Sequence, residues 1–117
     1  MLIAYTVALD LIRALRPVVL QLRKHSPDTA DQVERAASSI AFNLAEGSRR
    51  NGRDPRRFFD MANGSAGEIR GALDVADAWG WTIDSGPARA ILDRELGLLH
   101  GLTRRTRAVQ PAKSNDP

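Results

Sequence analysis

Three junctions place a residue that can cap a helix immediately before a proline, and they divide the chain into four segments. They are Ser26-Pro27, Asp54-Pro55 and Ser85-Gly86-Pro87. Proline favours the first position of a helix, because the backbone N–H that it lacks would find no partner there. A serine or aspartate just before the helix can accept a hydrogen bond from that turn. Each junction therefore predicts a helix start.

Every segment carries small or apolar residues mostly three or four positions apart, a spacing that forms one face of a helix. Gly47 or Gly52 is expected to end the second helix, and Gly80 the third, through a left-handed cap. Pro17 predicts a kink or a late start in the first. The four stripes are Ala4, Ala8, Leu11, Leu15, Val18 and Leu22; Val33, Ala37, Ile40 and Leu44; Phe58, Ala62, Ser65, Ile69, Ala72 and Ala76; and Ala88, Ile91, Leu92, Leu98, Leu99 and Leu102.

These patterns predict helices at about 3–25, 27–47, 55–79 and 87–107, within one domain spanning 1–108. The connections are short, so neighbouring helices should run antiparallel, which predicts an all-α, up-down-up-down four-helix bundle. Apolar residues make up 43% of the chain and aromatic residues only 5%, which favours aliphatic helix packing over a β-sandwich. Residues 109–117 are expected to form a flexible tail.

The composition also excludes several classes of protein. The chain has no cysteine, so it can form neither disulfides nor thiolate metal sites. No apolar stretch approaches the roughly 18 residues of a membrane-spanning helix, and the N-terminus lacks the basic and apolar regions of a signal peptide. The sequence therefore predicts a cytoplasmic protein that does not enter a membrane.

Arginines gather in two places that the expected topology brings to one end of the bundle. Cations near a helix C-terminus complement the helix dipole, whereas Arg56 and Arg57 fall in the first turn of a helix, where cations are unfavourable. Guanidinium groups suit phosphate, so contact with nucleic acid or another polyanion stands beside a merely solvated surface. No interleaved aromatic offers a base-stacking platform. The candidate residues are Arg49, Arg50, Arg53, Arg56, Arg57, Arg104, Arg105 and Arg107.

A polar ridge on the second helix faces a matching set on the third. The ridge consists of Arg35, Ser39, Asn43 and Glu46, spaced four, four and three apart. Folding the chain about residues 51–52 brings Arg35 level with Glu68, and Glu46 level with Arg57. We expect ion pairs across the two helices that fix their register and leave these residues no chemical role.

Three glycines, Gly64, Gly67 and Gly71, interrupt the third helix. Each costs up to about 1 kcal/mol relative to alanine. Either they allow close packing inside the monomer, or they form a flat face for another subunit, which is the preferred interpretation. Trp79 and Trp81 are expected to cap the opposite end of the bundle, with one of them well buried.

The stretch from Arg35 to Arg50, RAASSIAFNLAEGSRR, resembles a family pattern that reads roughly RAxxSIxxNIAEGxxR. An aromatic, an alanine, a Gly-Ser pair and a glutamate follow in both. This pattern is typical of the four-helix-bundle proteins encoded in 23S rRNA intervening sequences. On this chain it covers Arg35, Ser39, Asn43, Glu46, Gly47, Gly64, Ser65 and Glu68.

That family is structurally similar to the accessory variability proteins of diversity-generating retroelements, which form pentameric barrels with basic surfaces. Those proteins associate with a reverse transcriptase and with nucleic acid. The resemblance therefore implies a homopentamer that contacts RNA or DNA, with a reverse transcriptase or another protein as a further partner. The alternative is an interaction scaffold with no role in nucleic-acid binding.

An enzyme is the least supported class. Glu46, Asp54 and Asp60 are scattered acids, and no ligand spacing links them to His25 or His100. No glycine-rich phosphate loop is present, because no strand is expected to precede one. The sequence therefore predicts no catalytic residue, no metal and no cofactor.

Overall fold

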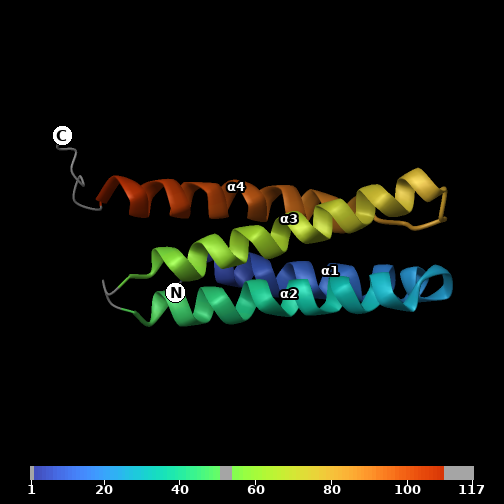
Figure 1. Cartoon of the computed structure of the whole chain (residues 1–117), viewed down its shortest axis with the longest axis horizontal. Coiled ribbons are helices and arrows are strands. Elements are labelled where there is room, and N and C mark those ends of the chain that lie inside the picture. Colours follow the sequence, from blue (N-terminus) through green and yellow to red (C-terminus); the bar gives the residue numbers. More distant parts are fainter. Residues whose placement is uncertain (1, 51–53, 110–117) are drawn as a thin grey trace.

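The computed structural model describes residues 2–50 and 54–109, with side chains described as far as Arg104. It contains four helices: α1 (Ile3–His25), α2 (Pro27–Ser48), α3 (Arg56–Trp79) and α4 (Gly86–Val109). Consecutive helices run in opposite directions (Figure 1). The described residues include no strand, and the expected all-α four-helix bundle is confirmed. Of the expected tail, Val109 ends α4, and residues 110–117 lie outside the described part.

Each helix packs against two neighbours around a shared core. α1 contacts α2 and α4, and α3 contacts the same two helices. The apolar stripes of α1 and α2 are buried throughout, as expected. On α3 the buried aromatic is Phe59, whereas Phe58, its expected counterpart, is only half-buried. The result is an elongated body of 52 × 32 × 21 Å.

Two of the expected helix boundaries form through the predicted chemistry. The Ser26 hydroxyl accepts a hydrogen bond from the Thr29 backbone N–H at 3.1 Å, which caps α2. Gly80 takes the left-handed conformation at φ 79° and ends α3. The next residue, Trp81, donates its backbone N–H to the Ala76 carbonyl at 3.0 Å, as in a glycine-terminated helix.

Other local expectations are wrong. Asp54 does not cap α3: it has φ 67°, Pro55 occupies the cap position, and no side chain accepts from the first turn. Gly47 lies inside α2 and does not end it; Arg49 is the C-cap residue, and Gly52, the other candidate, lies outside the described residues. Pro17 causes no late start, because α1 begins at Ile3 and continues through it. Its ring is exposed, so the carbonyl left without an N–H partner can face water.

The end of the bundle opposite the arginines is closed by one of the two tryptophans. Trp81 stacks on His25 with ring centroids 5.3 Å apart and planes 8° from parallel. Trp81 is only partly buried and Trp79 remains 72% exposed, so the expectation that one of them is well buried is wrong. Nearby, the Gln21 side chain accepts a hydrogen bond from the Asp84 backbone N–H at 2.7 Å, which joins α1 to the segment before α4.

Gly64, Gly67 and Gly71 do not serve packing within the bundle. All three are exposed, and a Cβ atom built on any of them would meet nothing within 4 Å. The interpretation as close helix–helix approach inside the monomer is therefore wrong. Contacts within one chain do not explain why these three positions carry glycine and not a residue that favours a helix more strongly.

Candidate nucleic-acid interface

The α2–α3 junction and the C-terminal end of α4 lie at the same end of the bundle (Figure 1). Arg49 and Arg50 close α2, and Arg56 and Arg57 open α3. Arg104 is exposed on α4. Of the other predicted residues, Arg53 lies outside the described part, as do the side chains of Arg105 and Arg107. We call this end, formed by Arg49, Arg50, Arg56, Arg57 and Arg104, the basic pole.

At the basic pole, two arginines share one aromatic ring. The guanidinium carbon of Arg50 lies 4.6 Å from the centroid of the Phe58 ring, and that of Arg57 lies 4.9 Å from it. Cations at these distances are attracted to the ring. An aromatic ring therefore lies among the arginines: Phe58 contacts cations from two helices. Phe58 is half-buried at this surface, and Phe59 is the aromatic residue of the core.

Acidic side chains hold two of the pole's arginines in place. Arg50 binds Glu46 one helical turn earlier at 3.0 Å, and Arg56 lies 3.6 Å from Asp60. Arg49 also faces Glu46, but at 4.0 Å and with its side chain 75% exposed. Such exposed pairs contribute little to stability. Their consequence is local: they orient Arg50 and Arg56, while Arg49 keeps most of its guanidinium in solvent.

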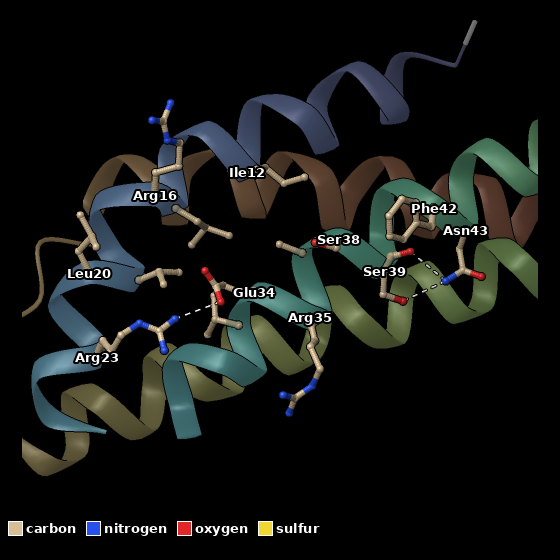
Figure 2. Close-up of a pocket in the computed structure, with 14 residues that line it drawn as sticks. Ile12, Arg16, Leu20, Arg23, Glu34, Arg35, Ser38, Ser39, Phe42 and Asn43 are labelled. Atoms are coloured by element: carbon tan, nitrogen blue, oxygen red, sulfur yellow. Dashed lines mark hydrogen bonds and ion pairs between the residues drawn. The ribbon is translucent and has the colours of Figure 1, made fainter. Parts of the chain in front are cut away.

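The polar motif residues of α2 and α3 meet through hydroxyls and an amide. Ser65 donates to the Ser39 hydroxyl at 3.0 Å across the two helices. Asn43 donates to the same hydroxyl at 3.0 Å and to the Ser39 carbonyl at 2.9 Å (Figure 2). Because Ser65 is buried, these bonds satisfy polar groups that would otherwise be costly. They also fix how α2 and α3 align.

The expected ion pairs across this seam do not form among the described residues. The predicted alignment of α2 with α3 along their length is right, because Ser39 and Ser65, which are hydrogen-bonded, are equally far in sequence from residue 52. Arg35 and Glu68, however, are both exposed, and in Figure 2 Arg35 projects away from its neighbouring helices. Glu46 pairs with Arg50 on its own helix and does not pair with Arg57.

Gly47 lets the start of α3 approach the end of α2. A Cβ atom at this position would lie 2.6 Å from Phe59 Cε1 and 3.3 Å from Phe58 Cβ. Phe59 is 5% exposed and belongs to the core. The glycine of the motif is thus a packing requirement, and it also positions Phe58 for its contact with the arginines.

A comparison with known families matches residues 1–85 to the 23S rRNA-intervening sequence protein family. The chain belongs to this family. The match spans α1, α2 and α3, and therefore includes the Ser39–Ser65 seam, Gly47 and most of the basic pole. No curated protein matches the chain.

The part of this family member beyond residue 85 is α4, and α4 holds a residue that the sequence interpretation missed. Glu95 is fully buried, and neither of its carboxylate oxygens has a hydrogen-bond partner among the described residues. Burial raises its pKa to about 8, and the nearby charge of Arg94 acts in the opposite direction. The carboxyl is therefore mostly neutral at pH 7.

The signal for Glu95 was present in the sequence. Glu95 stands in the core stripe of α4, at the position where the 4-3-4-3 spacing calls for an apolar residue. The buried members of that stripe are Ala88, Leu92, Glu95, Leu99 and Leu102. A charged residue is almost never fully buried without a partner, so periodicity alone does not predict that this glutamate faces the core.

A groove of about 900 Å³ runs between α1 and α2 (Figure 2). Its floor is apolar, and Leu20 and Phe42 on its rims are 66% and 73% exposed. Arg16 projects from the α1 rim (Figure 2). Arg23, further along α1, binds Asp31 at 2.8 Å and Glu34 at 3.0 Å. The groove is thus apolar with cationic edges.

The described residues meet neither the requirements of a metal site nor those of a membrane-spanning helix. They contain no cluster of three or more histidine or acidic side chains that could hold a metal ion. None of the described helices is both long and apolar enough to cross a membrane.

Proposed function

We propose that this chain is a non-enzymatic, self-associating bundle that binds RNA or DNA through its basic pole. The observation that supports this most is the arginine arrangement around Phe58. Arg50 and Arg57 come from different helices and lie against one ring. Cations held in one place lose less side-chain freedom on binding than free ones, and arginine's planar fork of donors matches phosphate.

The other exposed cations extend this surface. Arg49 and Arg104 are exposed. Arg49 follows the last residue of α2, and Arg104 lies in the C-terminal part of α4, and these two helix ends lie at the same end of the bundle (Figure 1). The sequence adds Arg53, Arg105 and Arg107 nearby in the chain. Phosphate contacts of this kind supply affinity without sequence specificity. We therefore propose binding that depends on charge and on strand geometry more than on base identity.

The family resemblance supports the assembly in this proposal. By analogy with the accessory variability proteins, the bundle would form a homopentamer and assist a ribonucleoprotein or a reverse transcriptase. The acids nearest the basic pole fit a non-enzymatic role, because Glu46 and Asp60 hold arginines in place. Metal-dependent cleavage of a structured RNA that is lost in Glu46→Gln would contradict this part.

Salt dependence of binding tests the proposal. Binding of a labelled single-stranded RNA should weaken steeply with salt, because each phosphate contact releases counterions. The double variant Arg49→Gln, Arg57→Gln should lower the slope of log K against log salt by about 1.5, at roughly 0.7–0.9 per contact. Both side chains are exposed, so the fold should be unaffected.

A matched control removes the same charge elsewhere. Arg70 on α3 and Arg94 on α4 are exposed away from the basic pole. Arg70→Gln, Arg94→Gln should therefore leave the salt slope within error of the parent chain. Equal losses in the two double variants would mean that net charge alone governs binding. If neither variant nor the parent binds RNA at low salt, the proposal is wrong.

A further inference from the structure

The groove between α1 and α2 leaves large apolar side chains uncovered. Its floor includes Leu15, Val19 and Val33, which are buried, whereas Leu20 and Phe42 stand at its rims mostly in solvent. Large contiguous apolar surfaces on small proteins mark interaction sites. The occupant must offer an apolar, narrow surface that fits between two helices, and acidic groups for the cationic rims.

The charged side chains at the rims of the groove indicate which charge its occupant carries. Arg16 and Arg35 line the groove, are exposed, and have no ion pair among the described residues. Glu34, the only acid that lines the groove, binds Arg23 at 3.0 Å. An acidic surface would therefore be attracted, and a basic one, such as the pole of another molecule, would be repelled.

The outward face of α3 on the same chain has the complementary properties. Met61, Gly64, Glu68, Gly71 and Val75 are all exposed, and their alternating spacing of three and four aligns them along the helix. The glycines make this face narrow, with open space where a Cβ atom would stand. From residue 60 to 79, α3 carries four acids against one arginine. Asp60 pairs with Arg56, and Asp74 and Asp77 pair with Arg89, so Glu68 is the one of the four with no ion pair among the described residues.

The two surfaces also lie at the same height along the bundle. Ser39 lines the groove and is hydrogen-bonded to Ser65, which sits between Gly64 and Glu68 on α3. A second copy turned about an axis parallel to the bundle can therefore bring its α3 face opposite the groove. No shift along that axis is needed.

We infer that the α1–α2 groove binds the outward face of α3 from a second copy of this chain. Phe42 and Leu20 then pack against the glycine positions of the neighbour, and Arg35 faces its Glu68. Because the two faces differ, each copy has one face of each kind, and it can contact a different neighbour through each. A contact of this type forms a closed ring when the rotation from copy to copy closes on itself without translation along the axis. The inference rests on the self-association in the proposed function and names its faces.

This contact has a consequence for the basic pole. Rotation about an axis parallel to the bundles leaves every copy pointing the same way, so all α2–α3 junctions gather on one side of the ring. A nucleic-acid strand that touches several poles at once would bind more tightly than one pole permits.

Absolute mass in solution, measured by multi-angle light scattering, tests the inference. The parent chain should have a mass that is a multiple of 12.8 kDa. Phe42→Glu places a charge in the groove, and Gly71→Leu places bulk on the α3 face. Each should weaken association on the order of tenfold or more, as loss of a central contact does, and shift the mass towards one chain.

Gly97→Leu provides the matched control for Gly71→Leu. Gly97 is also an exposed helical glycine with open space around a Cβ atom, but it lies on α4. This variant should keep the parent mass. Far-ultraviolet circular dichroism should show unchanged helicity in all variants; should Phe42→Glu unfold, the comparison of Gly71→Leu with Gly97→Leu decides alone.

Charge exchange tests the pairing of the two faces. Arg35→Glu and Glu68→Arg should each lower the assembled fraction, and the double variant should restore it, because the exchanged charges still face each other. A single-chain mass for the parent, or a parent mass retained in both Phe42→Glu and Gly71→Leu, overturns the inference. Loss of RNA binding with the mass unchanged would contradict only the nucleic-acid part of the proposed function.

Discussion

The α2–α3 seam and Glu95 on the core face of α4 both place polar groups in the interior, but they differ in whether these groups have partners. At the seam, the Ser39 hydroxyl accepts from both Ser65 and Asn43 at 3.0 Å. In α4, both carboxylate oxygens of Glu95 are buried without a partner among the described residues. Paired groups of this kind cost little and specify alignment, whereas an unpaired buried carboxyl must stay neutral.

The two regions differ in the same way at their glycines. Gly47 at the seam leaves no room for a Cβ atom, which would lie 2.6 Å from the Phe59 ring. Gly97 on α4 has nothing within 4 Å of that position. The seam is therefore specified in atomic detail, and the family match covers it, whereas α4 lies beyond the matched residues.

The largest expected effect comes from ionising Glu95. Its pKa is raised from 4.5 to about 8 in the folded chain, so the folded state binds a proton that the unfolded state releases. The stabilisation that this bound proton provides is complete below pH 4.5 and is lost as the pH rises through 8. The expected slope is about 1.4 kcal/mol per pH unit, or roughly 4 kcal/mol over the range.

Urea unfolding of the parent chain and of Glu95→Gln measures that loss. Glutamine keeps the shape of the side chain and does not ionise, so the parent should lose stability relative to the variant as the pH rises. Parallel stability curves between pH 4.5 and 8 would show that the carboxyl is not held neutral by burial.

A smaller effect is expected where the seam is tightest. Gly47→Ala should destabilise the fold by about 1–3 kcal/mol, because the added methyl overlaps the Phe59 ring. Gly97→Ala is the control and should stabilise by up to about 1 kcal/mol through helix propensity. Thermal unfolding of both reports the difference, and Phe59→Leu should relieve part of the Gly47→Ala loss. Equal stabilisation by the two alanines would remove the packing explanation of the motif glycine.

The hydroxyl pair of the seam should couple in a double-mutant cycle. Ser39→Ala and Ser65→Ala should each cost about 1–2 kcal/mol, since each leaves a polar group of the network without a partner. Together they should cost less than the sum, by roughly 0.5–1.5 kcal/mol, because the second change removes a group that the first had left unpaired. Strict additivity in chemical unfolding would mean that the hydrogen bond contributes nothing.

The smallest expected effect lies at the exposed edge of the seam. Glu46→Gln removes the partner of Arg50 at 3.0 Å and of Arg49 at 4.0 Å, but exposed pairs contribute less than about 1 kcal/mol. Thermal stability should therefore change little. RNA affinity should rise, because the basic pole loses one negative charge while Arg50 is still held against the Phe58 ring. A large loss of stability would show that Glu46 has a structural role which the geometry does not indicate.

The helices and most of the core could be predicted from the sequence, because these features depend on neighbours within one or two turns. The Ser26 cap reaches only to Thr29, and the left-handed end at Gly80 depends on its own lack of a Cβ atom. The same local logic was wrong at Asp54, which has φ 67° and does not cap α3. A capping residue before a proline is compatible with either outcome.

The candidate site could be predicted only in part. The topology alone placed the arginine-bearing ends of α2, α3 and α4 together, and Figure 1 shows these three helix ends at the same end of the bundle. The ring between Arg50 and Arg57 was missed, because Phe58 and Phe59 are adjacent and the sequence does not tell which one faces the core. Close packing around Gly47 decides that Phe59 is buried.

By itself, the sequence determined four helices, their antiparallel order, the alignment of α2 with α3 and the family motif. These follow from backbone chemistry and from periodicity along one chain. Only the tertiary structure decided which residues at the same height on α2 and α3 contact each other. Arg35 and Glu68 stand at the same height but point outward, whereas Ser39 and Ser65 meet, and Glu95 turns into the core. The reason is geometric: side-chain contact depends on the angle around each helix axis, and packing of all four helices sets that angle.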